Sequence, residues 1–194
     1  SISGTVRRQA IYFTNDTNMT ETNTEYVEIG PVRVQTGMET ANTYTGITIR
    51  GNSHKVVKIG QIHDLSTDTT DAVNLLDCTF GQVEIGGFYS RNTATKKHFN
   101  ISGAATFTKW LKVHGIDVTP GDNASTMVMQ VGGTATIPRL VLSGISVPVT
   151  GTNARLLQVA GTTATVTEVD FDNFTLTGGN SFYDQSISGQ PAPT

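Results

Sequence analysis

The chain has 194 residues, of which 37% are hydrophobic and only 15% are charged, and its net charge at pH 7 is −3. This length is enough to bury a core, and the charge excludes the basic footprint of a nucleic-acid-binding protein. Apolar runs stay well short of the roughly 18 residues of a membrane-spanning helix. The single cysteine, Cys78, excludes an internal disulfide and is expected to be a buried, inert thiol.

The first 26 residues fit the pattern of the remaining chain poorly. The stretch "QAIYF" (9–13) is typical of a strand, and "TNDTNMTETNTE" (14–25) is typical of a polar loop. We therefore expect residues 1–26 to form an irregular first coil or an excursion from the main fold.

From residue 27 onward, one eight-residue phrase returns at intervals of 26–30 residues. Its copies are VEIGPVRV (27–34), VKIGQIHD (57–64), VEIGGFYS (83–90), LKVHGIDV (111–118), LVLSGISV (140–147) and VDFDNFTL (169–176). The first, third and sixth positions are apolar in every copy. The break between them holds Gly86–Gly87, Gly115, Gly144 or Asn173, which suit a sharp bend with positive φ.

A second phrase, apolar–x–Gly, precedes the first along the chain. It is found as IRG (49–51), ISG (101–103), VGG (131–133), VAG (159–161) and ISG (187–189), with LDC (76–78) in the remaining coil. Three short strands per repeat, separated by turns, predict stacked coils that bury a common apolar column. We predict an all-β fold, a right-handed parallel β-helix of about six coils of 26–30 residues, spanning residues 27–189 with a tail at 190–194.

Residues at equal positions of the repeat should stack into outward columns. One such column is uncharged and rich in amides: Thr48, Asn74, Asn100, Gln130, Gln158 and Ser186. Amides and hydroxyls suit sugar hydroxyls, although an amide ladder also stabilises stacked strands without any ligand. The neighbouring Lys96, Lys97, His98 and Arg155 could hold an acidic glycan. Tyr89, which is expected to face outward, and Trp110 are candidate aromatic platforms for a sugar ring, although either would also suit a covered part of the rod surface or a subunit interface.

Charged residues form a second outward column, which reads Glu28, Lys58, Glu84, Lys112, Val141 and Asp170. Its alternating charges are expected to pair along the axis. Outward positions two apart on a strand lie about 6.6 Å apart, within the roughly 6.5–9.5 Å of inverting glycosidases. Asp170 and Asp172 are therefore candidate catalytic residues. A solvated acidic face or a calcium site would explain the same residues.

Metal and cofactor motifs are missing from the pattern. The histidines lack metal-ligand spacing on one strand, and the Gly-Gly pairs lack the lysine of a phosphate loop. We expect neither a metal nor a cofactor.

The phrase "VDFDNFTL" with its two-residue bend, and the variable loop before "MVMQVGG" (127–133), carry a resemblance to a known group. The chain resembles the right-handed parallel β-helix of the pectate-lyase-like proteins, and among them the bacteriophage tailspikes and tail fibres. The resemblance implies a segment of a homotrimeric rod on the extracellular surface of the virion, which binds host-surface polysaccharide. A polysaccharide-degrading glycoside hydrolase or lyase, or a bacterial surface adhesin, would share the same fold features.

Overall fold

The computed structural model describes residues 9–14, 23–34, 44–51, 53–65, 69–91, 97–118, 127–148, 155–160, 163–177 and 181–185. Within these ranges the regular structure is entirely β, in two sheets. Sheet A consists of β1 (Gln9–Thr14), β4 (Tyr44–Arg50), β6 (Thr69–Leu76), β8 (Lys97–Ser102), β11 (Met127–Val131), β13 (Arg155–Val159) and β15 (Ser181–Gln185). Sheet B consists of β2 (Asn23–Ile29), β3 (Val32–Val34), β5 (Ser53–Asp64), β7 (Thr79–Ser90), β9 (Thr106–His114), β10 (Ile116–Val118), β12 (Thr136–Pro148) and β14 (Thr165–Thr177).

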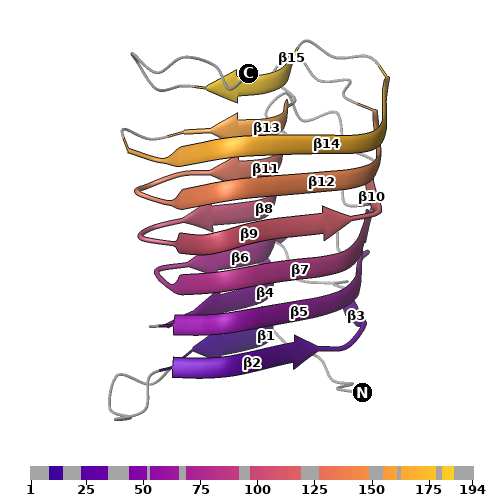
Figure 1. Cartoon of the computed structure of the whole chain (residues 1–194). Helices are drawn as coiled ribbons and strands as arrows, with labels where there is room; N and C mark the ends of the chain where they lie inside the picture. Colours follow the sequence, from indigo (N-terminus) through magenta and orange to yellow (C-terminus); the bar gives the residue numbers. More distant parts are fainter. Residues whose placement is uncertain are drawn as a thin grey trace.

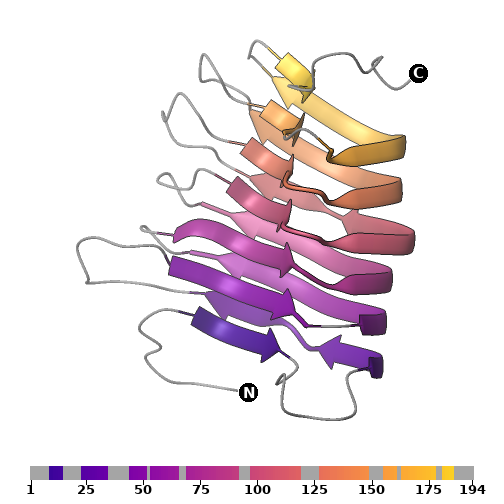
Figure 2. The ribbon, with the colours of Figure 1, turned by 90° about the vertical axis from the view of Figure 1, so that its left-hand side faces the viewer.

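The two sheets are the opposite walls of a β-solenoid, because the chain alternates between them and every pairing is parallel. Neighbours in sheet B are β5 and β7, then β7 and β9, whereas sheet A interleaves β6, β8 and β11. Figure 1 shows sheet B running from left to right in front and sheet A returning behind it as the chain climbs, so the coil is right-handed. Figure 2 shows the corners that join the two walls.

The described residues make about four turns, slightly fewer than the six coils expected. The stretch 1–26, expected to be irregular, contributes β1, which pairs with β4, and the start of β2. The expected tail at 190–194 lies outside the described residues.

The repeated phrase sets the register of sheet B as predicted. Its first apolar position forms one column through Val57, Val83, Leu111 and Leu140, and each of these side chains is completely buried. The third and sixth positions form two further buried columns, such as Ile85 beside Val113 and Phe88 beside Ile116. The apolar columns therefore fill the space between the walls, where burial contributes about 25 cal/mol per Å².

The bend inside the phrase is confirmed at three of its copies. Gly115, Gly144 and Asn173 have φ of 61°, 63° and 50°, a conformation that costs little for glycine and asparagine. Neither Gly86 nor Gly87 has a positive φ, so that coil bends without a left-handed residue.

The second phrase was misplaced by one residue in one coil. Leu75 and Leu76 pair with Ile101 and Ser102, so the phrase there is LLD (75–77) and not LDC. Asp77 takes the place of glycine with φ 45°, because a short polar side chain tolerates this conformation and bonds locally. Its Oδ1 accepts a hydrogen bond of 3.0 Å from the backbone N–H of Ala104 on the next corner.

The same correction places Cys78 at the inner corner. In the three following coils the equivalent corner position is occupied by Ala105, Ala135 and Ala164. All four side chains are buried. Burial raises the pKa of the Cys78 thiol to about 12. The expected buried thiol is therefore confirmed.

The last copy of the second phrase cannot be compared in the same way. Val159 of VAG (159–161) pairs with Gln185, the last described residue. Residues 187–189 themselves lie outside the described ranges.

Stacked corners make glycine indispensable at Gly133. Its φ is 66°, and a Cβ there would lie 2.8 Å from the backbone N and O of Gly103. We expect Gly133→Ala to lower the free energy of unfolding by at least about 1–2 kcal/mol, since the left-handed conformation alone costs that much. Chemical denaturation measures it. The matched control is Gly30→Ala, where a Cβ meets nothing within 4 Å. Equal losses for both variants would contradict the corner stacking.

Candidate functional site

The amide column lies in register on sheet A. Thr48 pairs with Asn74, Asn74 with Asn100, Asn100 with Gln130, and Gln130 with Gln158. The expected Ser186 is not the next member, because Gln158 pairs with Asp184. The column therefore ends on an acidic residue, and Ser186 lies outside the described residues.

The amides bond to one another along the column. Asn100 Nδ2 donates to Asn74 Oδ1 at 2.9 Å, and Gln130 Nε2 donates to Gln158 Oε1 at 2.7 Å. Thr48 and Asn74 are buried, whereas Asn100, Gln130 and Gln158 are half-buried. The accessible part of the column is therefore the run from Asn100 to Gln158.

An acidic residue beside the column was missed in the sequence. Asp71 Oδ2 accepts a hydrogen bond of 3.3 Å from Asn100 Nδ2, and Asp71 pairs in register with Lys97. Burial raises the pKa of the Asp71 carboxyl, although Lys97 and the bonds from Asn100 and Asn74 act against that rise. Register arithmetic on "TDAVN" could have found it, because Asp71 stands three residues before Asn74.

The cationic neighbours of the column are fewer than predicted. His98 is completely buried, and its ring packs on Phe88 with the centroids 5.5 Å apart, so it cannot touch a glycan. The reason is that two successive residues are buried at the start of each of these strands, as His98 and Phe99 are in β8. Lys97 and Arg155 are half-buried, and Lys96 lies outside the described residues.

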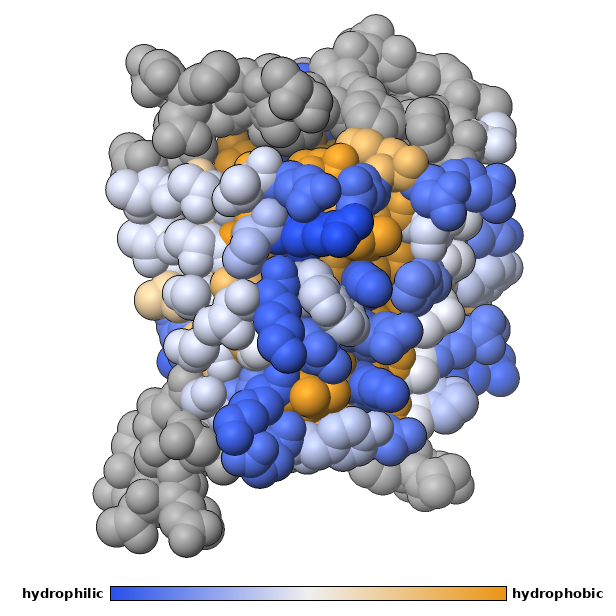
Figure 3. Space-filling view, in the orientation of Figure 1, coloured by the Kyte–Doolittle hydropathy of each residue, from blue (hydrophilic) through white to orange (hydrophobic). Residues whose placement is uncertain are grey.

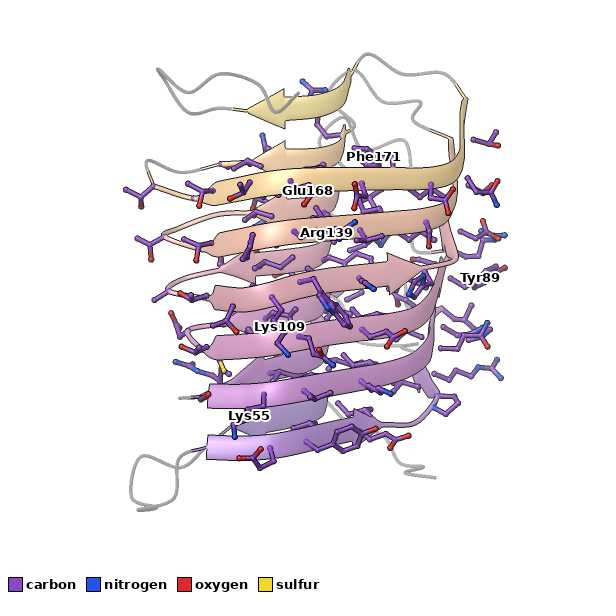
Figure 4. All side chains as sticks on the ribbon, viewed as in Figure 1. Lys55, Tyr89, Lys109, Arg139, Glu168 and Phe171 are labelled. Atoms are coloured by element: carbon purple, nitrogen blue, oxygen red, sulfur yellow. The ribbon has the colours of Figure 1, made fainter. Side chains whose placement is uncertain are left out.

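Tyr89 occupies an outward column of sheet B with Arg33, His63 and Asp117. Figure 4 shows it projecting from the edge of the coil. The Arg91 guanidinium lies 4.1 Å from the ring centroid, and the His63 ring lies 5.5 Å away. Arg91 also pairs with Asp117 through two contacts of 3.3 and 3.4 Å. Tyr89 is thus an aromatic group held in a charged frame, and not a bare platform.

The candidate catalytic pair lies at the C-terminal end of sheet B. Arg139 binds Asp170 at 2.7 and 2.8 Å and approaches Glu168 to 3.8 Å. The contact with Asp170 raises the pKa of Arg139 and holds the Asp170 carboxylate in an ion pair. Asp172 pairs in register with Ser143, and its side chain is exposed. The arrangement therefore fits a surface on which acidic residues are paired with Arg139 better than it fits a catalytic acid–base pair of Asp170 and Asp172.

The charged column of sheet B has the predicted register. Its contacts differ from the predicted ladder. Among the described residues Glu84 pairs with His114 at 3.5 Å, and the Lys112 ammonium lies 4.3 Å above the Trp110 ring. The charged side chains of this column therefore contact residues at other positions of the same face, and not the charged residues of the column on the neighbouring strands.

The described part of the chain contains neither a cluster of metal-binding side chains nor a membrane-spanning helix. Within the described ranges no group of three or more His, Cys, Asp or Glu side chains is placed to hold a metal ion, which leaves the calcium alternative without a cluster there. In the same part of the chain there is no helix long and apolar enough to cross a membrane.

Comparison with protein-family models, with curated proteins and with solved structures finds no match to this chain.

The buried His98 predicts a pH dependence of stability. Its ring nitrogens have no hydrogen-bond partner among the described residues, and burial lowers its pKa from 6.5 to about 3. Below about pH 6.5 the His98 ring is therefore protonated in the unfolded chain but stays neutral in the folded chain. The free energy of unfolding consequently falls as the pH drops toward 3. We expect His98→Phe to flatten this slope, measured as the free energy of unfolding from pH 7 to pH 4.

The matched control is Val128→Ala, beside His98 in the same buried column. It should lower stability equally at every pH and keep the slope. A slope that His98→Phe leaves intact would contradict the assignment.

Proposed function

We propose that this protein is a rigid rod that attaches to surface polysaccharide through the outer face of sheet A. The observation that carries the proposal is the continuous amide run Asn100–Gln130–Gln158, which is in register and partly accessible. Adjacent strands lie about 4.8 Å apart, so the run offers one amide per strand to an extended polymer.

The ladder bonds support binding because they fix the amides before the ligand arrives. A primary amide has two N–H donors and an oxygen with two lone pairs, so it can hold a ladder bond and a sugar hydroxyl together. Groups held in place beforehand lose less entropy on binding. Asp71 and Lys97 at one edge of the run add a carboxyl and an ammonium group to the same surface.

Tyr89 lies on β7 of sheet B, apart from the amide run, and is proposed as a separate contact for a sugar ring. The Tyr89 ring lies beside the guanidinium of Arg91 and the imidazole ring of His63. A sugar would meet the ring edge and the charged frame, because the guanidinium already lies over the ring.

The rod is proposed as a segment of a homotrimeric phage tailspike or tail fibre, on the extracellular surface of the virion. The support is the resemblance of the phrase "VDFDNFTL" and of the parallel solenoid. Light scattering in solution should give a mass near three times 20.7 kDa. A mass of 20.7 kDa would favour a monomeric surface adhesin with the same binding face.

A polysaccharide-degrading activity is the second candidate, and one observation favours it. Burial raises the pKa of the Asp71 carboxyl beside the amide run, which suits a proton donor better than the ion-paired Asp170 does.

Glycan binding should depend on the amide run. We expect Asn100→Ala and Gln130→Ala each to weaken capture of the host polysaccharide about 2- to 10-fold, because one hydrogen bond contributes roughly 0.5–1.5 kcal/mol. Surface plasmon resonance on immobilised polysaccharide measures this. Ser146→Ala, an exposed position of sheet B, is the control.

Unchanged capture by both amide variants, with the fold intact, would remove the run from the site. Shortening of the polysaccharide by the wild-type protein, lost in Asp71→Asn, would replace the binding rod with an enzyme.

A further inference from the structure

A β-bulge interrupts the outer face of sheet B at β9. Three residues separate the buried Phe107 and Leu111, whereas two residues separate the corresponding buried positions of β7 and β12. The extra residue leaves Thr108 and Lys109 exposed and Trp110 half-buried. Bulges re-aim side chains and are frequent beside functional sites. Figure 4 shows Lys109 on the same face as Arg139, and Figure 3 shows many hydrophilic side chains on this face with hydrophobic areas between them.

Two lysines lie close to Trp110 in the chain, Lys109 directly before it and Lys112 two residues after it. The Lys112 ammonium lies 4.3 Å from the Trp110 ring centroid. Among the described residues neither Lys109 nor Lys112 forms an ion pair. Both positive charges therefore lack a carboxylate partner in the described structure.

The acidic residues nearest in register are engaged elsewhere. Glu84 pairs in register with Lys112, yet its carboxylate lies 3.5 Å from the His114 ring. On the next strands Arg139 binds Asp170. The lysine–tryptophan cluster (Lys109, Trp110 and Lys112) thus holds two ammonium groups without an ion pair among the described residues, on a chain of net charge −3.

We propose that Lys109, Trp110 and Lys112 form a binding site for an acidic sugar residue, a uronate. The apolar face of the pyranose ring packs on the indole, and the carboxylate takes hydrogen bonds from the two ammonium groups. Moving Lys112 off the ring costs less than its new bond to the carboxylate contributes, because a cation–π contact near the surface is weaker than a hydrogen bond between two charged groups.

The cluster fits a uronate better than a nucleic acid. Affinity for nucleic acid grows with the number of phosphates that lysines and arginines neutralise, and this cluster offers only two lysines, with the carboxylates of Glu84 and Asp170 on other strands of the same sheet. The site lies on sheet B, on the wall opposite the amide run of sheet A (Figure 1), so it can be tested apart from the proposed function.

Trp110 is the only tryptophan of the chain, so its fluorescence reports this site alone. The full chain is titrated with a β-1,4-linked glucuronate tetramer and with cellotetraose, which differs by carrying CH₂OH in place of each carboxylate. We expect a saturable change with the glucuronate tetramer and at least about tenfold weaker binding of cellotetraose, since one charged hydrogen bond is worth that factor.

Lys109→Met and Lys112→Met should each weaken glucuronate binding about tenfold. The matched control Lys58→Met, an exposed lysine in the same outward column two strands away, should leave it unchanged. Equal binding of cellotetraose, no saturable change, or full binding by both lysine variants would overturn the proposal. Binding of a single-stranded oligodeoxynucleotide of equal charge as tightly as the glucuronate tetramer would also overturn it.

Discussion

Parallel stacking of the apolar columns is the constraint on which the rest of this structure depends. Each coil alone exposes its inward residues, and only the next coil covers them. Val83, for example, is completely buried between Val57 and Leu111 of the neighbouring strands. A slip of one residue would turn this set of side chains to the solvent. Burial therefore fixes the register, and the register fixes the place of every outward side chain.

The surface follows from that register, and the two walls carry different chemistry. On sheet A the outward positions hold amides, which bond along the column from Asn74 to Asn100 and from Gln130 to Gln158. On sheet B they hold charges that pair with near neighbours on the same face, as Arg139 does with Asp170. The neutral amides of sheet A suit sugar hydroxyls. The cations beside an aromatic ring on sheet B suit sugar carboxylates.

The inward columns and most bends could be predicted because burial leaves a strict two-residue alternation that glycine or asparagine interrupts. The sequence predictions failed at corners where the backbone or the burial pattern departs from this alternation. Asp77 replaces a glycine by adopting a positive φ itself, which hid one copy of the second phrase. His98 is buried although alternation places it outward, because successive residues turn inward at that corner. Arg91 over Tyr89 and the bulge before Trp110 depend on side-chain packing and on one added residue, which a repeat pattern does not record.

Cysteine cross-linking across two adjacent coils tests the register most directly. Lys58 and Glu84 are opposite each other in the ladder, and Lys112 lies one strand further. Strands are about 4.8 Å apart, and a disulfide needs Cα atoms within roughly 4.4–6.8 Å. Under mild oxidation Lys58→Cys with Glu84→Cys should form a disulfide, and Lys58→Cys with Lys112→Cys should not. A cross-link only in the second pair, in folded protein, would contradict the stacking on which every proposed site depends.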